Sequence, residues 1–431
     1  MMKPRRKWDS VRAGGDPAGG KPDVLKQRGV ARVRRALLWV LSLLLVLQAF
    51  PAPAEEVSGT RVMVVTDLHY MAPSLYEGSG LFLRSIAAAD SKMSHDSPEL
   101  LQALMEEARH QRPDVLLLTG DLTFYGEKLS HQELAAAMGQ LWDEGIPVYV
   151  LPGNHDINSP YARYFDGEDW GYTENVTPAE FREIWARCLP PAEAVSTMSY
   201  TIRLNDRVWI AMADVCVYEQ SFEVYGFYGE DQQNWLTPML REAREAGVTV
   251  ISVTHQSLIP HTDTRVNSYS IYNREYMLAD LRAGGVTLNL SGHIHTQHTV
   301  SQDGLTDVAT GALSVHPHSY GMVTVGADGV PVYRREQLCD EHLPEGFRAE
   351  SEAFFSAGTV SRVDAELQTL GVPDAERAAM VAFYRRMHVA LFSDSVDPTD
   401  PAWLEDPALP LWRTLAPDTD SGRRVRSVFG E

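Results

Sequence analysis

The stretch 151-LPGNHDINSPYARYF-165 decides how this chain is read, because it ends a strand-forming run in a turn rich in polar residues. Residues 148–151 (VYVL) favour a buried strand, and the Pro-Gly pair that follows ends it. The next three residues are Asn154, His155 and Asp156. Polar side chains at the end of a buried strand cost free energy unless they have hydrogen-bond, charge or metal partners. The partners must therefore come from elsewhere in the chain.

From about residue 60 the sequence alternates strand-forming runs with amphipathic helical stretches, which predicts an α/β fold. The expected strands are 61–66, 115–119, 148–151, 199–204, 208–213, 249–253 and 287–291. The expected helices are 97–111, 130–142, 177–187, 231–246 and 273–283. Residues 298–336 predict short strands between Gly turns, at the edge that closes this domain. In such folds the active groups gather at the carboxyl ends of the strands.

The sequence after about residue 343 becomes helical. Apolar side chains recur there at i, i+3, i+4, i+7 and i+11, which places them on one helix face. They are Met380, Phe383, Tyr384, Met387 and Leu391. We therefore expect a small C-terminal helical domain over residues 343–431.

The first 54 residues have the pattern of a secretory signal peptide. A basic stretch ends at Arg35, an apolar run covers residues 36–50, and Ala52-Pro53-Ala54 fits a cleavage site between small residues. This pattern predicts an exported protein, whether extracellular, at the cell surface or periplasmic. An uncleaved anchor stays open as an alternative, because the run is only slightly shorter than the ~17 residues of a spanning helix. Membrane contact is expected only through this segment, if it is uncleaved.

Charge and cysteine content exclude some classes of function. A net charge of −20 repels nucleic-acid backbones, so tight polynucleotide binding is not expected. Cys188, Cys216 and Cys339 are widely spaced and form no CxxC pair, so we expect buried or free thiols without catalytic work.

Side chains that can ligate a metal follow five of the expected strands. They are Asp67 and His69, Asp121, Asn154, His255, and His293 with His295. Both pairs are spaced i, i+2, which places two side chains on one face of a strand. The set holds carboxylates, imidazoles and one amide but no sulfur, which suits Mn, Fe, Zn or Ni. Seven ligands exceed the needs of one tetrahedral ion, so two divalent or trivalent ions with a bridging carboxylate are expected, ~3.5 to 4 Å apart as in centres that attack phosphorus.

The order D-x-H, GD, GNHD, H, GHxH resembles the calcineurin-like metallophosphoesterase superfamily over about residues 60–300. The surrounding sequence is similar to a secreted bacterial branch of cyclic-nucleotide phosphodiesterases with a C-terminal helical domain. The resemblance implies a four-layer sandwich for residues 58–340, with two mixed β-sheets flanked by helices.

The resemblance also implies a role for each motif residue. Asp67, His69 and His295 would hold the first ion, Asn154, His255 and His293 the second, and Asp121 would bridge them. A hydroxide between the ions would attack phosphorus. His155 would protonate the leaving oxygen, and Asp156 would accept the other N–H of His155 and fix its tautomer.

These roles predict a phosphodiesterase that acts on small nucleotides, cyclic ones included. A phosphomonoesterase or nucleotidase with the same centre is the alternative, and a cell-surface binding module is a third possibility. Gln256 stands where a second His is common in the superfamily. The stretch 255–270 is long and polar, so we expect it to form part of a substrate rim. Tyr70 and Tyr125 either stack on a base or anchor loops. Four further histidines are expected to be solvated loop residues: His261, His298, His316 and His318.

Overall fold

The computed structural model describes residues 59–88, 91–191, 193, 197–218, 222–261 and 266–430. The expected signal peptide, residues 1–54, lies outside the described residues, and its export role stays a prediction.

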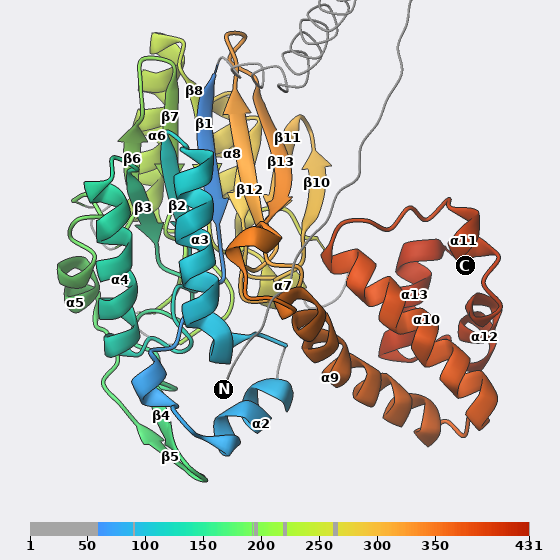
Figure 1. The fold of residues 1–431 in the computed structure, drawn as a ribbon. Coiled ribbons are helices and arrows are strands. Elements are labelled where there is room, and N and C mark those ends of the chain that lie inside the picture. Colours follow the sequence, from blue (N-terminus) through green and yellow to red (C-terminus); the bar gives the residue numbers. More distant parts are fainter. Residues whose placement is uncertain are drawn as a thin grey trace, which may run out of the picture. The chain divides into compact units, whose positions relative to one another are not determined.

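Two mixed sheets form the centre of the structure (Figure 1). The first has the order β13-β12-β1-β2-β3, in which β1, β2 and β3 are parallel and β12 is antiparallel to both of its neighbours. Its strands are β1 (Thr60–Val65), β2 (Val115–Thr119), β3 (Val148–Leu151), β12 (Ser319–Val325) and β13 (Pro331–Gln337).

The second sheet has the order β10-β11-β9-β8-β7-β6, with β7, β8, β9 and β11 parallel and an antiparallel strand at each edge. Its strands are β6 (Tyr200–Arg203), β7 (Val208–Met212), β8 (Thr249–Val253), β9 (Leu288–Ser291), β10 (His298–Gln302) and β11 (Leu305–Ala309). A separate hairpin joins β4 (Arg163–Asp166) to β5 (Asp169–Tyr172).

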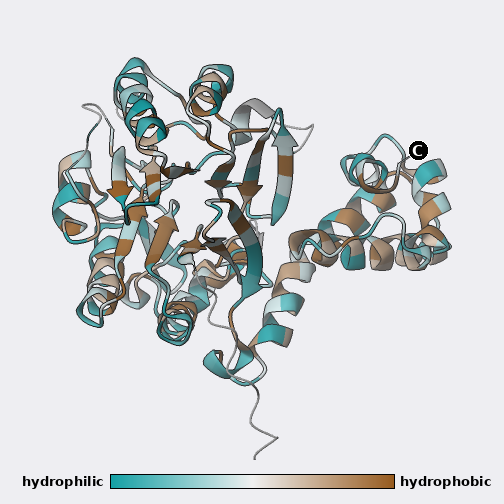
Figure 2. Cartoon of the chain, turned by 90° about the horizontal axis from the view of Figure 1, so that it is seen from above, coloured by the Kyte–Doolittle hydropathy of each residue, from teal (hydrophilic) through white to brown (hydrophobic). Residues whose placement is uncertain are grey.

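Helices cover the outer faces of both sheets. The described α-helices between residues 59 and 343 are α2 (Gly80–Ala88), α3 (Ser97–Gln111), α4 (Lys128–Asp143), α5 (Pro178–Ile184), α6 (Glu230–Ala246), α7 (Val266–Tyr269) and α8 (Arg274–Ala283), of which α2 and α7 lie below the sheets in the view of Figure 1. Along β7 and β8 the side chains alternate, as strand geometry requires. Ile210 and Val253 belong to the core shared with the first sheet, whereas Trp209 and Val250 pack with Trp235 of α6. Figure 2 shows the apolar colour gathered on the strands between the helices. The expected four-layer sandwich is confirmed.

The chain crosses between the sheets in a way that the sequence did not indicate. All seven expected strands and five expected helices form with ends within about two residues of their predicted positions, apart from the shorter α5. Residues 298–336, however, do not close one edge: β10 and β11 join the second sheet, whereas β12 inserts beside β1 in the first. The prediction also omitted α2 and the β4–β5 hairpin.

Helices follow the sandwich to the end of the described chain. They are α9 (Phe347–Thr369), α10 (Asp374–Phe392), α11 (Pro401–Leu404), α12 (Ala408–Leu415) and α13 (Asp420–Phe429). On the expected face of α10, Met380, Phe383, Tyr384 and Met387 are buried, in one core with Trp412. The division of the chain at residues 340–343 stays a prediction. Among the described residues we find no helix that combines the length and apolar character needed to cross a membrane.

Candidate metal centre

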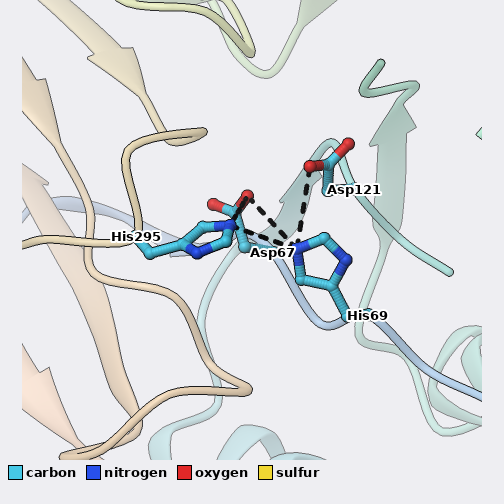
Figure 3. Close-up of side chains that lie close together, drawn as sticks. All are labelled: Asp67, His69, Asp121 and His295. Atoms are coloured by element: carbon cyan, nitrogen blue, oxygen red, sulfur yellow. Dashed lines mark hydrogen bonds and ion pairs between the residues drawn. The ribbon is translucent and has the colours of Figure 1, made fainter. Parts of the chain in front are cut away.

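Six of the expected ligands form two groups at the carboxyl ends of the strands. Asp67, His69, Asp121 and His295 each offer a ligand atom, and these atoms lie within 4.8 Å of one another. Asp121, His255 and His293 form a second group with the same spacing. Figure 3 shows the side chains of the first group pointing toward a common point, where the Nε2 atoms of His69 and His295 are 3.2 Å apart. The division is the one that the resemblance implies, although the ligand roles stay a prediction.

Asp121 is shared because its two carboxylate oxygens face different groups. Its Oδ2 lies 3.7 Å from Nε2 of His69, and its Oδ1 lies 3.3 Å from Nε2 of His255. The backbone N–H of His155 donates to the same Oδ1 at 3.0 Å, which fixes the carboxylate. Asn154 precedes that N–H, and its buried Oδ1 makes no hydrogen bond. The geometry therefore suits a bridging carboxylate.

The ligands converge through unusual backbone angles rather than along strand faces. β1 ends at Val65 and β9 ends at Ser291, so neither i, i+2 pair lies in a strand. Five ligands instead have positive φ, between 44° and 68°: Asp67, His69, Asp121, His293 and His295. Asp and His adopt this left-handed region more readily than most residues, yet it is unfavourable for any side chain and marks functional sites. The strand-face explanation of the spacing was wrong.

Two motif glycines are needed because other atoms approach them closely. A Cβ on Gly292 would lie 2.0 Å from Oγ1 of Thr66 and 2.7 Å from Oδ2 of Asp67. A Cβ on Gly153 would lie 2.2 Å from Oδ1 of Asp121. Glycine is therefore needed before His293 and before Asn154, because the side chains of Thr66 and Asp67 and the backbone and carboxylate of Asp121 occupy the space of a Cβ.

Buried lone pairs without partners test whether this centre fits a metal. Four such atoms of the expected ligands are buried and make no hydrogen bond: Asp67 Oδ1, Asn154 Oδ1, His255 Nε2 and His293 Nδ1. Leaving such atoms unpaired costs about 1 to 3 kcal/mol each. Second partners orient the rings: His255 Nδ1 donates to the Thr119 carbonyl at 3.0 Å, so Nε2 is the nitrogen that faces the centre. This donor set fits cations.

The charge states of the centre also suit metal binding. Burial opposes ionisation of Asp121, but the neighbouring His155 and His255 outweigh it and hold the pKa of this carboxyl well below its usual value. Burial lowers the pKa of His293 to about 3 and that of His69 well below its usual value, the latter with help from the buried Lys92. Ionised carboxylates and neutral imidazoles are the forms that ligate metals. His255 is the exception: burial lowers its pKa, but Asp121 outweighs burial and raises it to about 9.

His155 lies beside the first group, but Asp156 does not orient it. The His155 and His69 rings are 4.9 Å apart, and His155 Nε2 is 3.8 Å from Oδ2 of Asp121. Its Nδ1 is 2.7 Å from the Phe124 carbonyl, which accepts the N–H that was assigned to Asp156. That assignment was wrong, because Asp156 accepts from the backbone N–H groups of residues 122, 123 and 153 instead. Asp156 holds the loops together, and a backbone carbonyl fixes the tautomer.

Comparison with protein families identifies the domain that carries this centre. The profile of the calcineurin-like phosphoesterases matches residues 60–297, more than half of the chain. The chain belongs to this family.

Curated relatives of this phosphoesterase carry a narrower name. Proteins from Moraxella catarrhalis and Synechococcus, each named a probable cyclic nucleotide phosphodiesterase, are 24% identical over 199 residues and 25% identical over 219 residues. These alignments cover 46% and 49% of this chain, and 64% and 71% of the relatives. A third, from Rhodopseudomonas palustris, is 27% identical over 109 residues, 25% of this chain and 33% of that relative. The chain thus covers less than two thirds of two of these relatives.

Among solved structures, a dimetal phosphatase from Danio rerio aligns with a TM-score of 0.48 at 15% identity. The alignment covers 65% of this chain and 97% of that structure.

Several residues around the phosphoesterase centre escaped the sequence interpretation. Thr66 donates to Oδ2 of Asp67 at 2.8 Å, and the N–H of His293 donates to the same oxygen at 3.0 Å. Ser314, far along the chain, donates to the Asp67 carbonyl at 2.8 Å. The position of Thr66 next to Asp67 was a usable signal, whereas nothing in the sequence marks Ser314.

The expectation of solvated loop histidines was wrong. His316 and His318 are buried against Ser351 of α9, with ring nitrogens 3.2 and 2.6 Å from its Oγ. His298 is partly buried, the side chain of His261 is fully buried, and the two rings contact each other, His261 Nδ1 lying 3.0 Å from His298 Nδ1.

Five other side chains of the sequence analysis can also be placed. Gln256 is fully buried and donates to the Val224 carbonyl. Its side chain therefore packs between loops and does not form part of the expected substrate rim. Tyr70 is buried and donates to Glu133, which makes it a loop anchor. The cysteines are free thiols as expected, with Cys188 and Cys216 buried and Cys339 exposed.

Proposed function

We propose that this chain is a dinuclear metal-dependent phosphodiesterase that hydrolyses small nucleotides, cyclic ones included. The observation that carries the proposal is the pair of ligand groups joined by Asp121, with His155 at their edge. The names of the relatives from Moraxella catarrhalis and Synechococcus support the same substrate class.

Two ions in this centre would supply positive charge for the phosphate oxygens and would lower the pKa of a water between them. Asp67, His69 and His295 would hold one ion, Asn154, His255 and His293 the other, and Asp121 both. The absence of sulfur among these donors favours Mn, Fe, Zn or Ni.

His155 is the proton donor in this proposal. Its Nδ1 donates to the Phe124 carbonyl, so Nε2 is the nitrogen that faces the reaction. In the protonated ring Nε2 carries the proton that a leaving alkoxide needs, and general acid catalysis of this kind contributes about 10²- to 10⁴-fold. The backbone hydrogen bond holds the ring in place during the transfer.

The size and location of the substrate are also part of the proposal. A net charge of −20 opposes polynucleotides, so a local cationic centre selects small phosphoesters. The pattern of residues 1–54 supports export, which a search for the processed chain outside the cytoplasm would test.

The test compares a diester with its matched monoester. Protein reconstituted with Mn should hydrolyse bis(p-nitrophenyl) phosphate faster than p-nitrophenyl phosphate, and Asp121→Asn should lose both activities. Asp303→Asn, which changes an exposed carboxylate in the β10–β11 turn, is the control and should match wild type. Faster monoester hydrolysis would establish the phosphomonoesterase alternative. No hydrolysis of either ester with Mn, Fe, Zn or Ni would refute both.

A further inference from the structure

A series of aromatic rings continues outward from His155. The Tyr125 ring stacks on His155, with ring centroids 4.8 Å apart and planes inclined by 17°. Tyr161 lies 5.7 Å from Tyr125, and Phe222 lies 5.2 Å from Tyr161 and 6.5 Å from His155. We call Tyr125, Tyr161 and Phe222 the aromatic cluster. Its members come from three loops, after β2, β3 and β7, so the fold rather than one segment assembles it.

Exposure rises along this series. His69 in the metal centre is fully buried, the side chain of His155 is 15% exposed, and Tyr161 is 44% exposed. Tyr125 and Phe222 are half-buried. Aromatic residues that serve only as core lose nearly all of their exposure, as the adjacent Phe124 does. The aromatic cluster therefore connects the centre with solvent and keeps ring surface available for a ligand.

The members of the aromatic cluster have different tasks. Tyr125 contacts His155, and the guanidinium of Arg163 lies 5.1 Å from its ring centroid, so its ring already packs against two side chains. The most exposed ring of the aromatic cluster is that of Tyr161, and the half-buried ring of Phe222 lies against it. Their planes meet at 83°, so a flat group that stacks on one ring meets the other along its edge. Aromatic pairs favour both of these contacts.

We propose that Tyr161 and Phe222 bind the purine or pyrimidine base of the substrate nucleotide, on the side where His155 protonates the leaving oxygen. This inference rests on the proposed function, because His155 gives the cluster its place relative to the phosphate. Stacking between aromatic side chains and bases is tolerant of base identity. The subsite therefore selects nucleotides over simple phosphate esters without strong preference among bases.

The test measures binding of two probes that share the phosphate. AMP and inorganic phosphate are titrated into Mn-reconstituted protein by calorimetry, and the ratio of their Kd values isolates the contribution of the nucleoside. Wild type should bind AMP at least 10-fold more tightly than phosphate. Tyr161→Ala combined with Phe222→Ala should reduce this preference by about 10-fold, within the range that base stacking contributes.

Two further variants control for damage to the fold. Tyr161→Phe keeps the ring and should keep the preference for AMP. Tyr276→Ala removes a tyrosine that is 64% exposed on α8, away from the aromatic cluster, and should also keep it. A double variant that retains the wild-type ratio, or a wild type that binds AMP no better than phosphate, would overturn the subsite.

The outcomes for the subsite and for the proposed function are separable. Ring-dependent AMP binding without diester hydrolysis would support the subsite and reject the phosphodiesterase. Diester hydrolysis by wild type, together with an unchanged ratio of Kd values in the double variant, would support the phosphodiesterase and reject the subsite.

Discussion

Gly292→Ala is the smallest change that should disable the metal centre. Gly292 lies between β9 and His293, and its N–H donates to the His255 carbonyl at 2.9 Å. An added Cβ would lie 2.0 Å from Thr66 Oγ1 and 2.7 Å from Asp67 Oδ2. Real Cβ atoms do not approach other atoms within 3.0 Å, so Thr66 must retreat by about 1 Å. Because Thr66 donates to Asp67, the carboxylate must move with it.

A displacement of about 1 Å at a catalytic group can cost on the order of 100-fold in rate. We therefore expect kcat/KM for bis(p-nitrophenyl) phosphate to fall by about 100-fold in Gly292→Ala. Bound metal, measured by elemental analysis after gel filtration, should fall below two ions per chain, because Asp67 and His293 both adjoin the added methyl group.

Gly139→Ala is the matched control. A Cβ there meets nothing closer than 3.7 Å, and Gly139 lies inside α4. Alanine should raise stability by roughly 0.5 to 1 kcal/mol, since it favours the helix, and leave activity unchanged. If Gly292→Ala bound two ions and kept wild-type kcat/KM, the close approach would not constrain the site and the reasoning would be refuted.

Three other measurements address the acid, the metals and a buried histidine. His155→Ala should keep its metals and lose at least about 100-fold on an alkyl diester, but far less on a p-nitrophenyl diester, whose leaving group needs no proton; equal losses on both would contradict the general-acid role. Chelation should lower the unfolding temperature in calorimetry, since metal at 100 times its Kd adds about 2.7 kcal/mol per site, and Asp121→Asn should show much less of this effect. Burial lowers the pKa of His388 to about 3, below about 6.5 in the unfolded chain, so the unfolded state binds more protons and stability falls as pH drops below about 6.5. His388→Phe, which keeps the stacking on Phe355, should remove about 2 kcal/mol of the loss in unfolding free energy between pH 8 and pH 5; an unchanged acid loss would exclude His388 as its source.

The residues of the centre could be predicted from the sequence because each follows a strand. The hydrophobic runs fix where β1, β2, β3, β8 and β9 end, and parallel strands bring their carboxyl ends to one edge. That rule gathers the ligand groups without any knowledge of their geometry. It does not supply the backbone angles, so the i, i+2 spacing of Asp67 and His69 was attributed to a strand that ends before them.

Features that depend on contacts distant in sequence were not predictable. The insertion of β12 beside β1 joins residues more than 250 positions apart. His316 and His318 are buried because Ser351 of α9 lies against them, and nothing near these histidines in sequence reports that contact. The proton acceptor of His155 is the carbonyl of Phe124, and a carbonyl group carries no sequence signal at all. Sequence motifs therefore identify the side chains that gather at the centre, while the backbone that orients them is known only from the fold.

The orienting contacts run between the two sheets, which explains why the motifs are so far apart in the sequence. The Thr119 carbonyl at the end of β2, in the first sheet, fixes His255, which follows β8 in the second. The N–H of His293, after β9, donates to Asp67, after β1. Each of these ligands is therefore held by the sheet opposite its own, and the relative position of the sheets sets the distances between the ligands. Substitutions in the core between the sheets should alter metal affinity although they change no ligand. Substitutions within α10 to α13 that lower stability by the same amount should leave metal affinity unchanged.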